Sequence, residues 1–317
     1  MNAPIAAVLL AVATALVMSL TWWRRGGALL PLALAVVALS PVAVVAWLGA
    51  AWSRRTLTRP GRVRRSLRAV GLAALTQGCD VKARRIEKGR MNAVLIVTLT
   101  RPGEAPRLLV LKHLLAFGTL LGWAARAFGA TREYPRAQGT SARTSREARA
   151  SLLLHRLGFA SPACLGFSVR ERVVAVDYVE GRPLAEALGR SPALVEQLGV
   201  LLARMHTADY STGDPNPENM LVDSTGRIVP LDLEQSHFGA GATCTRKGFD
   251  VAWAGAFLAT DADRERLLAA YGPRSPELED AIRIARAHLD RFAPIVEHYG
   301  RRWRAAGPRE ERISVTP

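Results

Sequence analysis

The sequence of 317 residues is long enough for one or two domains with a sizeable core, and its 49% hydrophobic content is ordinary for a globular protein. Three cysteines, Cys79, Cys164 and Cys244, lie far apart without paired spacing, which argues against a zinc site or a disulfide framework and fits a reducing compartment. The formal net charge of +16 favours an anionic partner, either a lipid surface or a nucleic acid.

Two uncharged apolar segments open the chain. Residues 3–23 and 26–53 each reach the roughly 20 residues that a helix needs to cross a bilayer, and only Arg24 and Arg25 separate them. Neither segment shows a polar face, which disfavours buried helices of a soluble domain, and a second run directly after the first disfavours a cleaved signal peptide. The sequence therefore predicts a two-helix transmembrane hairpin over residues 1–53.

A strongly basic segment follows the second apolar run. Residues 54–68 read RRTLTRPGRVRRSLR, with seven arginines and no acidic residue. Because Lys and Arg concentrate on the cytoplasmic side, we expect a multi-pass protein of the cell (inner) membrane whose N-terminus and later residues are cytoplasmic. We interpret residues 54–79 as a basic juxtamembrane linker attracted to membrane lipids. Nucleic-acid binding is the alternative, but no aromatic-basic motif supports it, so we expect no nucleic-acid partner.

Short strands and one helix are predicted next. Residues 93–99 and 107–112 are apolar runs joined by a Pro-Gly turn, which predicts a β-hairpin. Residues 145–157 have leucines at helical positions, and Thr144 and Glu147 have the spacing of a capping box, so we expect a helix that begins at Ser145.

An apolar stretch over residues 114–128 separates the hairpin from this helix. It is too short and too often interrupted by glycine to cross a bilayer. Two interpretations fit it equally: a segment in the membrane interface, or a helix packed on the small lobe.

Beyond the helix, the pattern changes from strands to helices. Residues 163–169 and 172–179 predict two more strands, and a helix follows with Ser191 as N-cap and Pro192 at its first position. Residues 275–303 predict one or two long amphipathic helices. The order is a small strand-rich lobe, a hinge and a larger helical lobe, which is an α+β arrangement.

Three polar residues are clustered between these helices. Two short strand-like pieces, NMLV and RIVPL, flank the turn DSTG, and Asn219 begins the first piece while Asp232 follows the second. If the pieces pair, both residues lie at one edge of the hairpin, beside the loop that carries Asp214. Oxygen ligands of this kind suit Mg²⁺, which usually shares them with substrate phosphates. A solvated hairpin with Asp and Asn as turn formers is the alternative.

This cluster resembles the catalytic loop of protein kinases. The letters DPNPEN, from Asp214 to Asn219, are similar to the DLKPEN form of that loop, with the same step of five residues from Asp to Asn. The step of thirteen residues from Asn219 to Asp232 suits the metal-binding Asp of the kinase DFG motif, which is written DLE here. His206 stands where kinases often have a His near the end of the preceding helix.

Other kinase elements appear in the same order along the chain. Lys112 closes the strand LLVLK as the phosphate-pairing lysine closes VAIK, and Glu147 lies in the next helix, where a kinase places the carboxylate that fixes the lysine. VDYVEG resembles the kinase hinge, which implies adenine contacts from the backbone of Asp177 and Val179. Asp250 resembles the structural Asp behind the catalytic loop. The alternatives are a strand-end charge for Lys112 and a capping role for Glu147.

Departures from the kinase pattern narrow the resemblance. The loop reads TGD where protein kinases have HRD, so Thr212 and Gly213 replace the usual His and Arg. Only eighteen residues separate Asp232 from Asp250, which is short for a peptide-docking segment, and the segment EKGRMNAV has a single glycine where the phosphate loop should be. The chain is therefore most similar to the atypical branch: lipopolysaccharide core kinases, aminoglycoside and choline kinases, and RIO-type kinases.

The resemblance implies a two-lobed protein-kinase-like fold of the α+β class, preceded by the two transmembrane helices. The kinase-like domain would span residues 80–310, with an N-lobe over about 80–178 and a C-lobe over about 182–310.

The implied function is that of a membrane-anchored phosphotransferase that uses ATP and Mg²⁺. Asp214 would accept the proton of the attacking hydroxyl, Asn219 and Asp232 would hold Mg²⁺, and Lys112, fixed by Glu147, would bind the ATP phosphates. The expected acceptor is a hydroxyl of a membrane-linked lipid or glycolipid, or of a small molecule. A membrane-tethered pseudokinase scaffold and a Ser/Thr protein kinase acting on a membrane-protein partner are the alternatives.

Overall fold

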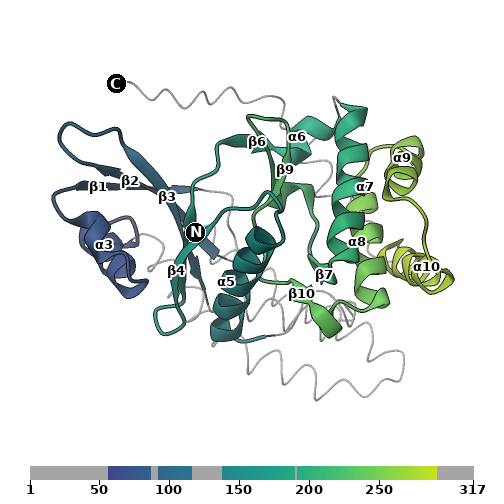
Figure 1. Cartoon of the computed structure of the whole chain (residues 1–317), viewed down its shortest axis with the longest axis horizontal. Coiled ribbons are helices and arrows are strands. Elements are labelled where there is room, and N and C mark those ends of the chain that lie inside the picture. Colours follow the sequence, from purple (N-terminus) through teal and green to yellow (C-terminus); the bar gives the residue numbers. More distant parts are fainter. Residues whose placement is uncertain (1–55, 87–91, 116–137, 190, 291–317) are drawn as a thin grey trace, which may run out of the picture.

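The structure is a computed structural model that describes residues 56–86, 92–115, 138–189 and 191–290 (Figure 1). The predicted transmembrane hairpin over residues 1–53 lies outside these ranges. Among the helices within them, none is both long enough and apolar enough to cross a bilayer.

Two further predictions concern residues outside the described part. Residues 116–128 of the apolar stretch and residues 87–91 of the segment EKGRMNAV lie outside the described ranges. Both predictions therefore stay predictions.

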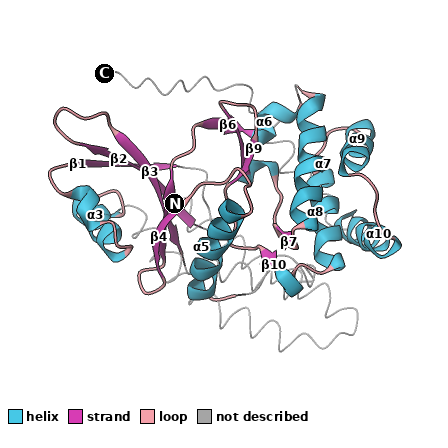
Figure 2. Cartoon of the chain, viewed as in Figure 1, coloured by secondary structure: helices cyan, strands magenta, loops and turns pink. Residues whose placement is uncertain are grey.

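The first lobe is built on a five-stranded antiparallel sheet with the strand order β1-β2-β3-β5-β4 (Figure 2). Its strands are β1 (Asp80–Ile86), β2 (Asn92–Thr100), β3 (Arg107–Leu114), β4 (Cys164–Ser168) and β5 (Val173–Asp177). The predicted hairpin is confirmed as β2 and β3, and the next two predicted strands are confirmed as β4 and β5. Strand β1 was not predicted, because charged side chains such as Lys82 and Arg84 obscure its alternating pattern.

The segment predicted as a juxtamembrane linker is part of this lobe in the structure. It forms the helix α3 (Pro60–Ala69) and the 3₁₀ turn η1 (Ala73–Thr76). Val63 and Leu67, four residues apart on one face of α3, are fully buried against the sheet. Arg64 donates to the carbonyl oxygens of Thr76 and Cys79, at 2.9 and 2.7 Å. The arginines conceal an apolar face, which explains why the sequence resembled a linker.

The helix that follows the sheet begins earlier than predicted. Helix α5 spans Thr140–Arg156, with Gly139 at its N-cap. Thr144 therefore lies inside the helix, where its hydroxyl donates to the carbonyl oxygen of Thr140 at 2.9 Å, so the predicted capping box is wrong. Glu147, its expected partner, points to the site between the lobes instead.

The second lobe is helical, and small strands lie on the side that faces the sheet (Figure 1). Its helices are α6 (Leu184–Leu188), α7 (Pro192–Thr207), α8 (Cys244–Ala256), α9 (Asp261–Tyr271) and α10 (Pro276–Asp290). Its strands and 3₁₀ turns are β6 (Gly181–Pro183), β7 (Tyr210–Ser211), η2 (Pro217–Asn219), β8 (Met220–Asp223), β9 (Ile228–Pro230), β10 (His237–Phe238) and η3 (Gly239–Gly241).

The core of this lobe lies where α7, α8 and α9 meet. Leu198, Leu202, Val251 and Leu267 are fully buried in it. Helix α7 begins at Pro192 with Ser191 at the N-cap position, as predicted, although no capping bond from the Ser191 side chain is formed within the described residues.

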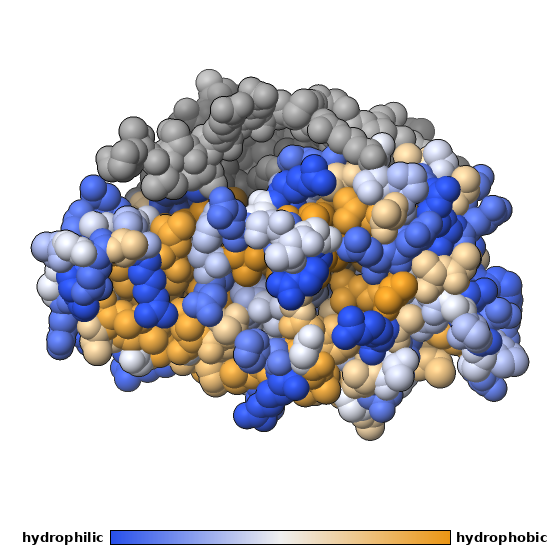
Figure 3. Space-filling model, turned by 45° about the horizontal axis from the view of Figure 1, so that its top comes forward, coloured by the Kyte–Doolittle hydropathy of each residue, from blue (hydrophilic) through white to orange (hydrophobic). Residues whose placement is uncertain are grey.

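The predicted α+β arrangement of a sheet lobe followed by a helical lobe is confirmed. On the face shown in Figure 3, hydrophilic side chains are interspersed with apolar groups across both lobes.

Candidate active site

Three predicted residues from distant parts of the sequence meet between the lobes. Lys112 on β3 places its Nζ 3.1 Å from Oε1 of Glu147 on α5 and 2.5 Å from Oδ1 of Asp232, which follows β9. The other carboxylate oxygen of Glu147 accepts a hydrogen bond from the backbone N–H of Leu233, at 2.9 Å. Glu147 therefore lies where it can fix Lys112, and Asp232 contacts the same ammonium group.

The surroundings of Lys112 favour its charged form. Burial alone would lower the pKa of this lysine, but the carboxylates of Asp232 and Glu147 outweigh burial and hold its pKa above the ordinary value of 10.5. Lys112 thus remains a cation, and a buried cation whose partners are carboxylates can also bind phosphate oxygens.

The loop that carries Asp214 lies at the edge of a small hairpin. Strands β8 and β9 pair antiparallel, as predicted, and the N–H of Leu231 donates to the carbonyl oxygen of Asn219 at 2.8 Å. Asn219 Nδ2 donates to Asp214 Oδ2 at 2.8 Å, and the indole Nε1 of Trp253 on α8 donates to Asp214 Oδ1 at 2.7 Å. The structure therefore brings Asp214 and Asn219 into direct contact, at the edge of the hairpin that leads to Asp232.

Asp250 holds the same loop from behind. Its carboxylate accepts the backbone N–H groups of Thr212 and Gly213, at 2.7 and 2.9 Å, and it contacts Nε2 of His206 at 3.2 Å. His206 also contacts the hydroxyl of Tyr271 at 2.7 Å, so this histidine has a structural place in the helical lobe.

Glycine is required at position 213 for two geometric reasons. Its φ of +72° lies in the left-handed region, and a Cβ there would lie 2.3 Å from the carbonyl oxygen of Gln235. The arginine that protein kinases have at this position would not fit.

A buried network surrounds Glu234 and was not predicted from the sequence. The guanidinium of Arg143 donates to both carboxylate oxygens of Glu234 and to Oδ1 of Asn92, and Asn92 Nδ2 donates to Glu234 Oε2 at 3.0 Å. Gln138 Nε2 donates to the carbonyl oxygen of Glu234 at 2.8 Å. The sequence signal was limited to an acidic residue two positions after Asp232, because these partners lie far away along the chain.

Of the two predicted hinge residues, Asp177 is the last residue of β5 and Val179 lies two residues beyond it. In the pairing of β3 with β5, Asp177 lies opposite Leu109 and Val174 lies opposite Lys112. The predicted hinge therefore begins three residues further along β5 than the residue that pairs with the lysine. The backbone N–H of Asp177 already donates to the carbonyl oxygen of Ala163, at 3.0 Å, so an adenine contact at Asp177 would fall to its carbonyl oxygen. Adenine binding by Asp177 and Val179 stays a prediction.

The side chains of Asn219 and Asp232 fit the chemistry of Mg²⁺. Because Nδ2 of Asn219 donates to Asp214, its amide presents Oδ1 as the acceptor atom. Asp232 adds a carboxylate that is 30% exposed. One carboxylate and one amide oxygen suit Mg²⁺, which is usually bound by one or two carboxylates together with phosphates and water.

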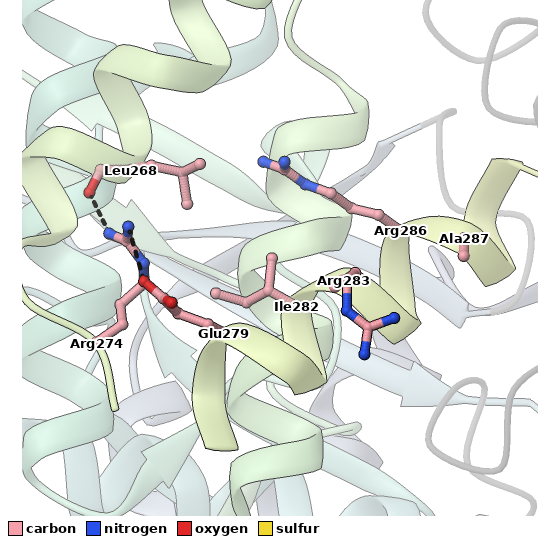
Figure 4. A pocket seen from close by; sticks show the side chains of 7 residues that line it. All are labelled: Leu268, Arg274, Glu279, Ile282, Arg283, Arg286 and Ala287. Atoms are coloured by element: carbon pink, nitrogen blue, oxygen red, sulfur yellow. Dashed lines mark hydrogen bonds and ion pairs between the residues drawn. The ribbon is translucent and has the colours of Figure 1, made fainter. Parts of the chain in front are cut away.

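A separate cavity of about 420 Å³ lies between α9 and α10 in the helical lobe, away from the site around Lys112 (Figure 4). It is lined by Leu268, Arg274, Glu279, Ile282, Arg283, Arg286 and Ala287. None of these residues belongs to the cluster around Lys112 and Asp214.

Comparisons with solved structures find distant matches. The complex of Rio2 kinase from Chaetomium thermophilum with ADP/Mg²⁺ and phosphoaspartate is 17% identical, with a TM-score of 0.44, over 75% of this chain and 77% of that one. The complex of Rv3197 with erythromycin from Mycobacterium tuberculosis is 14% identical, with a TM-score of 0.43, over 92% of this chain and 82% of that one. No curated protein sequence matches the chain.

The comparison with protein families gives a direct assignment. Residues 82–308, which are more than two thirds of the chain, match the phosphotransferase enzyme family known as APH. The matched range includes all the site residues described above. The chain therefore belongs to the phosphotransferase enzyme family and is a phosphotransferase.

Proposed function

We propose that the chain transfers the γ-phosphate of ATP to a hydroxyl group of a membrane-linked lipid or glycolipid, or of a small molecule. The observation that carries the proposal is the ion-pair cluster of Lys112, Glu147 and Asp232 beside the pair of Asp214 and Asn219. Phosphoryl transfer needs positioning and charge neutralisation more than covalent participation of the protein. These five side chains match that need.

Each residue has a separate task in the proposed reaction. Lys112 binds the α- and β-phosphates, and Glu147 keeps it in place through the contact at 3.1 Å. Phosphate oxygens take the position that the Asp232 carboxylate holds beside Lys112. Mg²⁺, held by Asn219 and Asp232, neutralises charge on the phosphates when it is bound.

Asp214 orients the attacking hydroxyl and accepts its proton. Its carboxylate is well suited to this task because Asp250 fixes the loop backbone and Asn219 fixes one carboxylate oxygen. A base held in one orientation needs no rearrangement when the hydroxyl arrives.

The proposal of a membrane-linked acceptor rests on the sequence. Two uncharged runs, residues 3–23 and 26–53, precede the arginines of residues 54–68, and this order is typical of a cytoplasmic domain behind a transmembrane hairpin. A tethered kinase meets membrane-bound hydroxyl groups at high local concentration.

Transfer of labelled phosphate tests this function. Full-length wild type and Asp232→Ala are purified in detergent and incubated with Mg²⁺ and γ-labelled ATP, together with membrane lipid and membrane protein fractions. We expect label in the lipid fraction with wild type only. Asp280→Ala, which removes an exposed carboxylate on α10, is the matched control and should transfer label like wild type.

Two outcomes would contradict the proposal in different ways. Equal labelling by wild type and Asp232→Ala would show that this site does not transfer phosphate. Label in the protein fraction alone would keep the kinase activity but replace the acceptor.

A further inference from the structure

The carboxylate of Asp214 is held from two sides. Asn219, five residues later in the same loop, donates to Oδ2 at 2.8 Å, and Trp253 on α8 donates from its indole N–H to Oδ1 at 2.7 Å. Trp253 therefore contacts the proposed base directly, although the two residues lie far apart in the sequence.

The indole of Trp253 is itself fixed by two aromatic neighbours, one within α8 and one at its C-cap. Phe249, one turn before it, is stacked on the indole with 5.8 Å between ring centroids and an angle of 18°. Phe257, one turn after it, meets the indole edge-on at 4.9 Å and 83°. Such pairs restrict the side-chain rotamer, so the direction of the N–H is set before any ligand binds.

Helix α8 is also anchored relative to the catalytic loop. Asp250, one turn before Trp253, accepts the N–H groups of Thr212 and Gly213. On another face of α8, Gly248 packs so closely on α10 that a Cβ would lie 2.6 Å from the Cβ of Ala281. The helix thus holds the backbone of the loop through Asp250 and the side chain of Asp214 through Trp253.

The chemistry of the indole suits a positioning role. Its N–H is a donor only, so it can hold a carboxylate oxygen but cannot take the proton that the base must accept. The terminal torsion of an aspartate is broad and roughly two-fold, so a carboxylate without such a bond would rotate more freely. A fixed carboxylate presents one oxygen to the acceptor hydroxyl in a constant orientation.

We infer that Trp253 is a positioning residue for phosphoryl transfer, which acts by holding Oδ1 of Asp214 through its indole N–H. The inference rests on the proposed role of Asp214 as the base. It assigns the tryptophan to the chemical step and not to nucleotide binding, because its bond goes to Asp214 and not to Lys112 or Asp232.

The test is the single-turnover conversion of Mg²⁺-ATP to ADP by the full-length protein, with water as the acceptor. Trp253→Phe keeps a stacking ring and removes the donor. Hydrogen bonds to charged groups contribute about 1.5–3 kcal/mol, so we expect the rate to fall roughly 10- to 100-fold. The half-saturating concentration in the same experiment should change by less than about two-fold, because the nucleotide-binding residues are untouched.

A double-mutant cycle shows whether Trp253 acts through Asp214. In the Asp214→Asn background, the change Trp253→Phe should alter the residual rate by less than about two-fold, because the base it positions is absent. An additive loss in the double variant would overturn the inference.

A control separates the hydrogen bond from the packing of the ring. Phe257→Leu removes the edge-on contact and leaves the indole N–H, so it should slow the reaction much less than Trp253→Phe. An equal loss in the two variants would assign the effect to packing and contradict the inference. Should Trp253→Phe fail to fold, 3-benzothienylalanine at position 253 replaces the N–H by sulfur in the same ring shape and gives the same expected loss.

The inference and the proposed function fail in distinguishable ways. A wild type that labels neither membrane fraction in the transfer experiment and does not convert ATP contradicts the proposed function. A wild type that converts ATP, with Trp253→Phe at the same rate, contradicts only the role of Trp253.

Discussion

The guanidinium of Arg143 donates hydrogen bonds to both carboxylate oxygens of Glu234, at 2.8 and 2.9 Å, and both side chains are almost completely buried. One turn further along α5, Glu147 contacts Lys112 and accepts the N–H of Leu233. Helix α5 is therefore tied at two successive turns to the segment that carries Asp232.

Loss of the buried ion pair between Arg143 and Glu234 should lower the stability of the fold. Removal of one partner leaves an uncompensated buried charge, so we expect Glu234→Ala to lower the free energy of unfolding by about 3–5 kcal/mol. The double variant Arg143→Leu/Glu234→Leu removes both charges and should recover most of the loss. Urea unfolding followed by circular dichroism measures both values. A loss below about 1 kcal/mol in Glu234→Ala, the value typical of an exposed pair, would contradict this account.

Lys112 and its partner Glu147 predict graded effects on phosphate transfer. Lys112→Met removes the cation that binds the phosphates, and we expect kcat/KM for ATP to fall by roughly 100- to 1000-fold. Glu147→Gln keeps an oxygen that can accept from Leu233, so its loss should be smaller. The exposed Lys82→Met on β1 is the matched control and should behave like wild type. Equal activity of Lys112→Met and Lys82→Met would refute the role of Lys112.

His113, next to Lys112 on β3, predicts a loss of stability in mild acid. Burial, and then the charge of Arg62, lower the pKa of His113 from its ordinary value of 6.5 to about 4. Between these pH values the unfolded chain binds a proton that the folded chain does not bind, so stability falls as the pH decreases from 6.5 to about 4, by up to about 3 kcal/mol.

The variant His113→Gln isolates this contribution. It cannot titrate, so its free energy of unfolding, from urea unfolding, should fall less between pH 7 and 4.5 than that of wild type, by about 2.5 kcal/mol. If the two proteins lose stability in parallel over this range, His113 is not the group responsible.

Two glycines with left-handed backbones provide a matched test of the loop that carries Asp214. Gly213 and Gly226 have φ values of +72° and +81°, but a Cβ would clash with the carbonyl oxygen of Gln235 only at Gly213, and nothing lies within 4 Å at Gly226. Both alanine variants carry the strain of about 1–2 kcal/mol for this conformation. Gly213→Ala must also move the loop, so it alone should lose ATP turnover, while Gly226→Ala should keep it. Retained turnover in Gly213→Ala would show that the loop tolerates the displacement.

Local patterns predicted most of the secondary structure because each element carries its own signal. The β2–β3 hairpin and helix α7 were readable from apolar runs, Pro-Gly turns and the Ser-Pro start. The linker prediction failed at α3 because its arginines hide the stripe of Val63 and Leu67, and a stripe two residues long is a weak signal.

The residues of the site were predictable only where spacing is itself a motif. Asp214, Asn219 and Asp232 could be found because one loop and one hairpin set their separation. Arg143 and Trp253 could not, because their contacts with Glu234 and Asp214 arise from the packing of α5 and α8 against distant segments. The capping box failed for a related reason: the spacing of Thr144 and Glu147 is equally common inside a helix.

In the proposed reaction, Asp214 serves as the base that accepts the proton of the attacking hydroxyl. Single-turnover ATP conversion by wild type and Asp214→Asn, with ADP binding measured in parallel by calorimetry, tests this role. We predict that the rate falls by roughly 100-fold or more while the affinity for Mg²⁺-ADP changes by less than about three-fold. An Asp214→Asn variant that converts ATP as fast as wild type would contradict the claim.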